Sequence, residues 1–303
     1  MSVPIRIESF GVAVTVRVEA RTAPERADLL DAVWSVLPPG AASTSGLRPA
    51  VELAITRHRG GCTVGAADGA SHRSGTVAEG LHHLDREIRA VVSLLAPDHV
   101  FVHAGVVAAR GRAIVFPGRT FAGKTTLVAR LVADGAAYLS DEYAVLGPDG
   151  TVWPYPRPLS FRTSDGRVDV APRAIGEIAT SEPKPVAAVV ATTYRPGATW
   201  APVEGAPADA AAALLSNAVA AQLRPAAVLA TVATAARAAR CLTGDRGDAA
   251  LAAPAILAAL VHRRAPDCAP RPAGPRALRP SPSGSLGRRL APATDHPVPF
   301  PHR

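Results

Sequence analysis

The sequence predicts a mixed α/β protein in which a glycine-rich loop connects a strand to a helix. Apolar residues alternate with other residues in stretches such as VAVTVRVE, which is typical of a half-buried strand, and recur at helical spacing between Val77 and Leu95. Residues 112–134 combine a strand, a glycine-rich loop and a helix in that order. The chain has 303 residues, 48% of them hydrophobic, which suffices for one large domain or two modest ones with a core.

Residues 1–98 are predicted to form a small α+β unit in which no chemistry is visible. The expected strands cover 3–9, 11–19, 51–57 and 62–66, and the expected helices cover 23–36 and 77–95. Thr22 is a plausible N-cap of the first helix, which Pro38 and Pro39 end, and Pro97 ends the second helix.

Residues 99–264 are predicted to form the domain that carries the function. Two strands, VFVHAGVVAA and RAIVFP, are joined by a tight turn at Arg110–Gly111. The glycine-rich loop and a helix over 124–134 follow, and AAYLSDEYAVL is a further strand interrupted by two acids. A later strand at 186–192 precedes alanine-rich helices at 208–222, 226–239 and 247–262. Residues 265–303 are rich in Pro, Ser, Gly and Arg without periodicity and predict a disordered tail.

Charge, cysteine content and hydropathy exclude several classes of protein. The net charge of +8 invites a nucleic-acid interpretation, but much of the excess lies in the tail, and no basic run interleaved with aromatics occurs before it. Three widely spaced cysteines do not form a zinc motif or a disulfide framework. No signal peptide and no apolar stretch of about eighteen residues is visible. We therefore expect a cytoplasmic protein that binds neither nucleic acid nor a membrane.

Residues 118–125 read Gly-Arg-Thr-Phe-Ala-Gly-Lys-Thr, which is a complete P-loop motif. In such a loop the backbone N–H groups point at an anion, and the following helix directs the positive end of its dipole at the phosphates. Lys124 is expected to reach the β- and γ-phosphates, and the Thr125 hydroxyl to ligate Mg²⁺. The predicted nucleotide-binding residues are Gly118, Arg119, Thr120, Phe121, Ala122, Gly123, Lys124, Thr125 and Thr126.

Asp141 and Glu142 follow Lys124 by seventeen and eighteen residues, at the end of a short apolar strand. A carboxylate at the end of a neighbouring strand can hold Mg²⁺, and a second can accept a proton from an attacking hydroxyl. Adjacent residues of a strand point to opposite faces, so both acids can act only if the backbone turns there. The alternative is that only one of the two is functional. His103 lies on the strand that precedes the loop, where a structural role and a functional role are both open.

The stretches VHAGVV, GRTFAGKTT and YLSDE together resemble the catalytic domain of the bacterial HPr serine kinase/phosphorylase family and its offshoots. This family shares a P-loop fold with phosphoenolpyruvate carboxykinases. The resemblance covers about residues 99–163, and the later segments TTYRPG and CLTGDRGDA are similar only loosely. It implies that Lys124 binds phosphate, that Thr125 and Glu142 hold Mg²⁺ together with Asp141, that Asp141 accepts the proton, and that His103 orients Asp141.

The chain also departs from this family in three places. Phe121 stands where the family's loop usually has glycine, Glu142 replaces an aspartate, and no C-terminal motif for engaging HPr is found; Arg195-Pro196-Gly197 is at most a faint echo. Arg162, after a proline-rich turn, could complement the transferring phosphate, or it could be an ordinary surface arginine of an arginine-rich chain.

Three functions are compatible with these residues. The leading expectation is an ATP- and Mg²⁺-dependent kinase that phosphorylates a hydroxyl on a peptide, a protein serine or a small metabolite. The alternative is a non-catalytic nucleotide-binding scaffold or switch with the same P-loop. A GTPase or transport ATPase ranks lowest, since neither an N-K-x-D nor an L-S-G-G-Q motif occurs. The sequence does not identify the acceptor or distinguish ATP from GTP.

Overall fold

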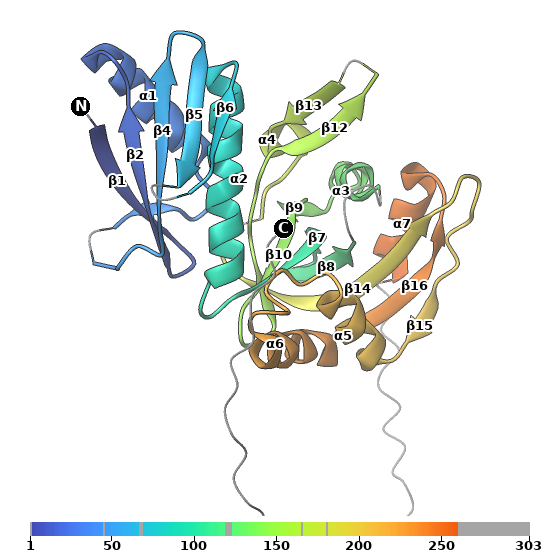
Figure 1. Ribbon diagram of the computed structural model, residues 1–303. Helices are drawn as coiled ribbons and strands as arrows, with labels where there is room; N and C mark the ends of the chain where they lie inside the picture. The colour runs from blue at the N-terminus through green and yellow to red at the C-terminus, as the bar shows by residue number, and fades with distance from the viewer. Residues whose placement is uncertain are drawn as a thin grey trace, which may run out of the picture. The chain divides into compact units, whose positions relative to one another are not determined.

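The computed structural model describes residues 2–44, 46–66, 69–118, 123–164, 166–179 and 181–259, apart from the side chain of Arg167. Within this part the chain is a mixed α/β protein, as its hydropathy pattern predicts (Figure 1). The predicted disordered tail at 265–303 lies outside the described residues. No helix in the described ranges is both long and apolar enough to cross a bilayer.

The N-terminal sheet has six strands in the order β3-β1-β2-β4-β5-β6. The strands are β1 (Ser2–Ser9), β2 (Val12–Glu19), β3 (Ala42–Ser43), β4 (Val51–His58), β5 (Gly61–Ala66) and β6 (Ser71–Ser74). The predicted hairpin turn at Phe10–Gly11 is confirmed, with positive φ angles of 49° and 78° that suit the twist of a tight antiparallel pair. β6 occupies part of a segment that the sequence predicts to be a polar loop, because its backbone completes the ladder of β5.

Helices α1 (Ala23–Val36) and α2 (Val77–Leu95) cover this sheet and match the predicted ranges (Figure 1). Each begins with a capping box, Thr22 with Glu25 and Thr76 with Glu79. Apolar side chains of α2 and of the sheet share one core: Leu84, Ile88, Val92, Val16, Ile55 and Val64. That core also contains Phe101 and Tyr143 from the second sheet and Tyr155 from the segment after β11, so the two sheets are packed together.

The second sheet has eight strands, of which seven follow the order β11-β10-β7-β8-β14-β16-β15 while β9 pairs with β7. The strands are β7 (Val100–Ala109), β8 (Arg112–Pro117), β9 (Ala137–Ser140), β10 (Tyr143–Leu146), β11 (Thr151–Trp153), β14 (Lys184–Tyr194), β15 (Val203–Gly205) and β16 (Arg240–Arg246). β14 runs parallel to both β8 and β16, and the other neighbours are antiparallel. The carboxyl ends of β8, β14 and β16 therefore meet at one edge of the sheet.

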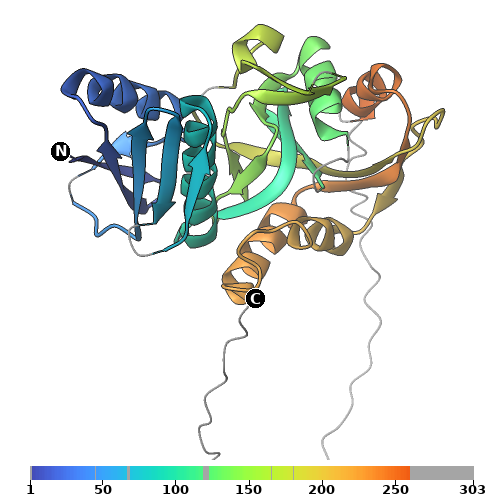
Figure 2. The ribbon, with the colours of Figure 1, turned by 45° about the horizontal axis from the view of Figure 1, so that its top comes forward.

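Helices cover both faces of the second sheet (Figure 2). Helices α3 (Lys124–Ala133) and α7 (Ala249–Ala259) pack on one face, through contacts of Leu127, Leu131 and Ile256 with Val107 and Ile114. Helices α5 (Pro207–Leu215) and α6 (Pro225–Arg237) pack on the other face. A separate ribbon of β12 (Leu159–Thr163) and β13 (Gly166–Val170) precedes the short helix α4 (Pro172–Ile175).

The prediction of one continuous helix over 208–222 is wrong in its second half. The helix ends at Leu215, because the next residues pair with the backbone of β7. His103 donates its N–H to the carbonyl of Asn217 at 2.8 Å, and Val219 donates to the carbonyl of Phe101 at 2.9 Å. Tertiary pairing thus overrides the local preference of an alanine-rich segment for helix.

Strands β12, β13, β15 and β16 are absent from the sequence-based prediction. β16 contains Gly244 and three charged residues in seven, so it lacks the apolar run that marks a buried strand. Its place between β14 and β15 stabilises it instead. The last predicted helix, 247–262, is observed over Ala249–Ala259, and its final residues lie outside the described part of the chain.

Candidate functional site

The P-loop motif lies at the carboxyl edge of the parallel strands. β8 ends at Pro117, and Gly118 follows with its N–H bonded to the carbonyl of His103 at 3.0 Å. Gly123 precedes α3 in the left-handed conformation, with φ of 69°. Residues 119–122, which include Phe121 and three more of the predicted nucleotide contacts, lie outside the described residues. The described parts nevertheless give the strand, loop and helix order that anion binding at a helix N-terminus requires.

The first turn of α3 brings Lys124 and Thr125 to Asp141, which follows β9. The Thr125 hydroxyl donates a hydrogen bond to the Asp141 carboxylate, and the Lys124 ammonium acts on the same carboxylate electrostatically. Thr126, the next residue of the helix, is exposed. The structure thus brings together three of the residues that the sequence singles out.

Gly105 of β7 makes this approach of α3 to the sheet feasible. A Cβ at this position would lie 2.6 Å from Cγ2 of Val128 in α3, well inside van der Waals contact, and 3.7 Å from both Oδ1 of Asp141 and Cβ of Lys124. Only a residue without a side chain lets the helix lie this close to the strand. The missing side chain of Gly105 therefore leaves the space in which Lys124 and Asp141 approach each other.

Burial dominates the electrostatics of this pair. Desolvation raises the pKa of Asp141 to about 6, although the hydrogen bond from Thr125 and the charge of Lys124 both oppose the rise. Desolvation also lowers the pKa of Lys124, against the attraction of Asp141. Each charged form is thus less stable here than in water, even beside its partner. Such a mutual perturbation in one site is typical of functional groups.

The backbone bends at Asp141 and Glu142, as a joint function of both acids would require. The Ser140 hydroxyl accepts hydrogen bonds from the N–H groups of Glu142 at 3.3 Å and Tyr143 at 3.2 Å. The backbone of Asp141 also interacts with the Tyr138 hydroxyl, which donates to the carbonyl of Arg157 at 2.8 Å. Side-chain hydroxyl groups therefore stabilise the backbone of the bend.

Glu142 points to a different set of partners from Asp141. Its carboxylate forms ion pairs with Arg89 of α2 and with Nε of Arg157, the latter at 3.3 Å. The side chain is 30% exposed. Metal binding by Glu142 remains a prediction. A metal ion there would have to share the carboxylate with Arg89 and Arg157.

His103 lies on β7 directly opposite Tyr143, and its ring contacts the tyrosine ring at a centroid distance of 4.9 Å. His103 and Gly105 belong to the same face of β7 because they are two positions apart along the strand. Continuing the register of Tyr143 with His103 places Asp141 opposite Gly105. His103 is thus a diagonal neighbour of Asp141, which fits the orienting role that the resemblance implies.

Arg246 is a buried residue of the site that the sequence analysis overlooks. It ends β16, is only 2% exposed, and donates to the carbonyl of Gly123 at 2.8 Å. Further hydrogen bonds reach the Thr192 hydroxyl and the Gly247 carbonyl, both at 3.3 Å. A signal was present in CLTGDRGDA, where an arginine stands between two glycines at the end of a strand. Its contact with the loop spans 123 residues, however, and no local pattern indicates it.

Replacing Arg246 with Met is expected to weaken ATP binding about tenfold, because the Gly123 carbonyl loses its charged donor, keeps only the N–H of Leu127, and no longer ties the loop to β16. The measurement is isothermal titration of each variant with Mg²⁺ and ATP. Arg240→Met is the matched control, since Arg240 lies on the same strand and pairs with Glu204 at the surface. Equal affinities for Arg246→Met and wild type would exclude this role of Arg246.

The residues near the loop fit a magnesium ion. Oδ1 of Asp141 is buried without a hydrogen-bond partner in the described structure, beside the Thr125 hydroxyl. Hydroxyl and carboxylate oxygens are ligands that Mg²⁺ takes together with phosphate oxygens and water. No cluster of three or more His, Cys, Asp or Glu side chains that could hold a metal occurs within the described ranges. A magnesium ion here would therefore depend on the nucleotide for much of its coordination.

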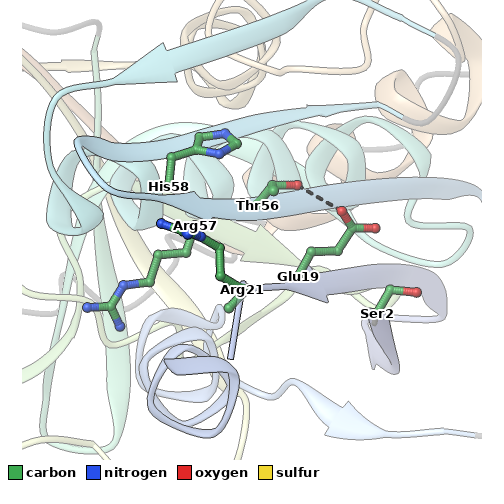
Figure 3. A pocket seen from close by; sticks show the side chains of 7 residues that line it. Ser2, Glu19, Arg21, Thr56, Arg57 and His58 are labelled. Carbon is green, nitrogen blue, oxygen red and sulfur yellow. Dashed lines mark hydrogen bonds between the residues drawn. The ribbon is translucent and has the colours of Figure 1, made fainter. Parts of the chain in front are cut away.

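Two other features lie apart from this site. Arg162 is exposed on β12, in the separate ribbon, where it pairs in register with Arg167. A hollow at one end of the six-stranded sheet is lined by Ser2, Glu19, Ala20, Arg21, Thr56, Arg57 and His58 (Figure 3). Thr56 donates to Glu19 at 3.1 Å there, and the hollow contains no residue of the P-loop.

Neither models of known protein families nor the sequences of curated proteins match this chain. The geometry around Gly123, Lys124, Thr125 and Asp141 is therefore the basis on which a function can be inferred.

Proposed function

We propose that this protein is an ATP- and Mg²⁺-dependent phosphotransferase that transfers the γ-phosphate to a hydroxyl group. The observation that carries the proposal is the meeting of Lys124, Thr125 and the buried Asp141 carboxylate where the P-loop motif enters α3. The resemblance of VHAGVV, GRTFAGKTT and YLSDE to HPr serine kinases supports the same chemistry and an HPr-kinase-like fold.

The loop and α3 bind the polyphosphate in this proposal. The backbone N–H groups of Gly118 and Gly123 and the N-terminus of α3 face the β- and γ-phosphates, and the Lys124 ammonium donates to their oxygens. Thr125 and Asp141 hold Mg²⁺, which neutralises part of the phosphate charge when it is bound. In the free protein, burial lowers the pKa of Lys124 because it destabilises the charged ammonium group. The negative charge of bound phosphate offsets this destabilisation.

Asp141 orients the acceptor hydroxyl and takes its proton. With a pKa of about 6 the carboxylate is mostly ionised at neutral pH, so it can accept. Strong basicity is not needed, since in a loose phosphoryl-transfer transition state the hydroxyl proton leaves late and alignment matters most. His103, the diagonal neighbour, keeps Asp141 in this orientation.

Replacing Lys124 with Ala is expected to lower affinity for ATP by about two orders of magnitude, because the pocket loses its phosphate-contacting cation. Titration of wild type and variant with ATP and with GTP, at fixed Mg²⁺, measures the effect and the base preference together. Lys184→Ala removes the other lysine and is the matched control.

Catalysis is tested separately with γ-labelled ATP and a panel of hydroxyl acceptors. Label should appear on an acceptor with wild type and not with Lys124→Ala. Binding of ATP by wild type without transfer to any peptide, protein or metabolite hydroxyl would favour the nucleotide-binding scaffold instead. Failure of wild type to bind either nucleotide would contradict both functions.

A further inference from the structure

Four charged side chains form a closed ring beside Asp141. Asp85 and Arg89 lie one turn apart on α2, and Arg89 donates from Nε to Asp85 at 3.1 Å. Arg89 also pairs with Glu142. Arg157 closes the ring, because it binds Asp85 through two hydrogen bonds of 2.7 Å and Glu142 at 3.3 Å. Each acid thus contacts both arginines.

The ring is balanced in charge, and its members apart from Glu142, which is 30% exposed, are largely shielded from solvent. The side chain of Asp85 is 4% exposed, that of Arg89 10% and that of Arg157 18%. Two acids and two arginines neutralise one another, so removal of a single member would leave a buried charge without compensation. Burial and the doubly bonded Arg157 hold the geometry of the ring.

Two members of the ring are connected to the catalytic acid. Glu142 is the next residue after Asp141, so its carboxylate anchors the bend from one side. Arg157 anchors it from the other, since its carbonyl accepts from the Tyr138 hydroxyl, which interacts with the backbone of Asp141. In a regular strand Glu142 would point to the face opposite that of Asp141. At the observed bend Glu142 pairs with Arg89 of α2.

We infer that Asp85 and Arg89 of the N-terminal region are positioning residues of the phosphotransfer site, and that Glu142 is their anchor rather than a magnesium ligand. This inference rests on the proposed function, and it gives residues 1–98 a role that their sequence does not reveal. In this arrangement α2 sets the bend that presents Asp141 to Lys124 and Thr125.

Three variants of the full chain test the ring: Arg89→Met, Glu142→Gln and the two combined. The combined variant removes one acid and one base, and it leaves the Asp85–Arg157 pair intact, so its fold is the least disturbed. All three are expected to lower transfer by about a hundredfold, as misplacement of a catalytic group by about 1 Å does. The combined loss should equal the single losses, since each breaks the same link. Arg86→Met, an exposed arginine of the same helix, should keep wild-type transfer.

The magnesium dependence of ATP binding separates an anchor from a metal ligand. If Glu142 is an anchor, the Mg²⁺ concentration needed for half-maximal ATP binding should stay within about twofold of wild type in both Glu142→Gln and Arg89→Met. If Glu142→Gln alone raises the Mg²⁺ concentration needed by about tenfold or more, Glu142 is a metal ligand and the inference is wrong.

Titration of the Asp141 carboxyl by carbon NMR, without nucleotide, provides a test that does not depend on catalysis. In the combined variant a loosened bend admits water, so the titration midpoint of Asp141 should fall from about 6 toward its ordinary value of 3.8. An unchanged midpoint overturns the positioning role even if transfer is lost. Failure of wild type to bind ATP would instead remove the proposed function, while this titration would still report on the ring.

Discussion

Replacing Asp141 with Asn is expected to lower phosphoryl transfer by about a hundredfold to ten-thousandfold and to leave ATP affinity within a few fold of wild type. Asparagine keeps the shape of the side chain and can still accept the hydrogen bond from Thr125. It cannot take a proton from the acceptor hydroxyl at neutral pH, and it lacks the charge that aligns the hydroxyl and the metal. The loss should therefore appear in kcat far more than in nucleotide binding.

Transfer from γ-labelled ATP under single-turnover conditions measures this loss directly. Asp31→Asn, at an exposed position of α1, is the matched control and should retain wild-type transfer. A variant Asp141→Asn that transfers at the wild-type rate would show that the carboxylate has no part in the chemistry. Loss of ATP binding together with transfer would instead assign Asp141 to the nucleotide pocket.

The same substitution is expected to stabilise the fold above pH 7. Asp141 is largely buried. Its pKa of about 6 means that the free-energy cost of desolvating the ionised carboxylate exceeds the stabilisation that Lys124 and Thr125 give it. A neutral amide avoids that cost, by up to about 3 kcal/mol from the difference between this pKa and the unfolded value. A residue that destabilises the fold is typical of a functional site. If Asp141→Asn raises the free energy of unfolding and abolishes transfer, Asp141 is a functional residue.

Features whose causes are local in the chain could be predicted from the sequence. The ranges of α1 and α2 follow from capping residues three positions apart and from helical apolar spacing. The Phe10–Gly11 and Arg110–Gly111 turns follow from the short connection between alternating strands. Lys124 and Thr125 likewise belong to a contiguous motif. The bend at the two acids also has a local cause. Ser140 immediately precedes them, and its hydroxyl accepts the N–H groups of Glu142 and Tyr143.

Features that depend on distant partners could not be predicted. Arg246 reaches Gly123 over 123 residues, Arg89 reaches Glu142 over 53, and Arg157 reaches Asp85 over 72. A single sequence offers no pattern for such pairs, since each residue alone looks like a solvated arginine or acid. Arginine is also the common basic residue of this chain, so no single arginine stands out. β16 was missed for the same reason, because β14 and β15 stabilise it from outside its own sequence.

The pH dependence of stability is the second large effect expected of Asp141. Its pKa in the folded protein, about 6, exceeds the ordinary value of 3.8 that applies to the unfolded chain. Between these values the folded state binds more protons than the unfolded state, so stability falls as the pH rises through this window. The contribution is complete below about pH 4, and about 3 kcal/mol of it is lost above about pH 6.

Two histidines act in the opposite direction and must be separated from Asp141. Desolvation lowers the pKa of both His99 and His83, so the folded state binds fewer protons than the unfolded state near their ordinary value of 6.5. Stability from these groups therefore rises with pH across part of the same range. The net slope of wild type alone cannot assign any one of them. Subtracting the profile of Asp141→Asn removes the histidine contributions, which the two proteins share.

Urea unfolding of wild type and Asp141→Asn at pH 4.5 and pH 7.5 gives the comparison. The variant should gain on wild type by about 2 kcal/mol between the two pH values, while Asp31→Asn should gain nothing comparable. Because the carboxylate must be ionised to accept a proton, kcat/KM of wild type should rise over the interval in which this stability is lost, with a midpoint near 6. A parallel pair of stability profiles would mean that Asp141 titrates as an ordinary surface acid. The buried environment assigned to it beside Lys124 would then be wrong.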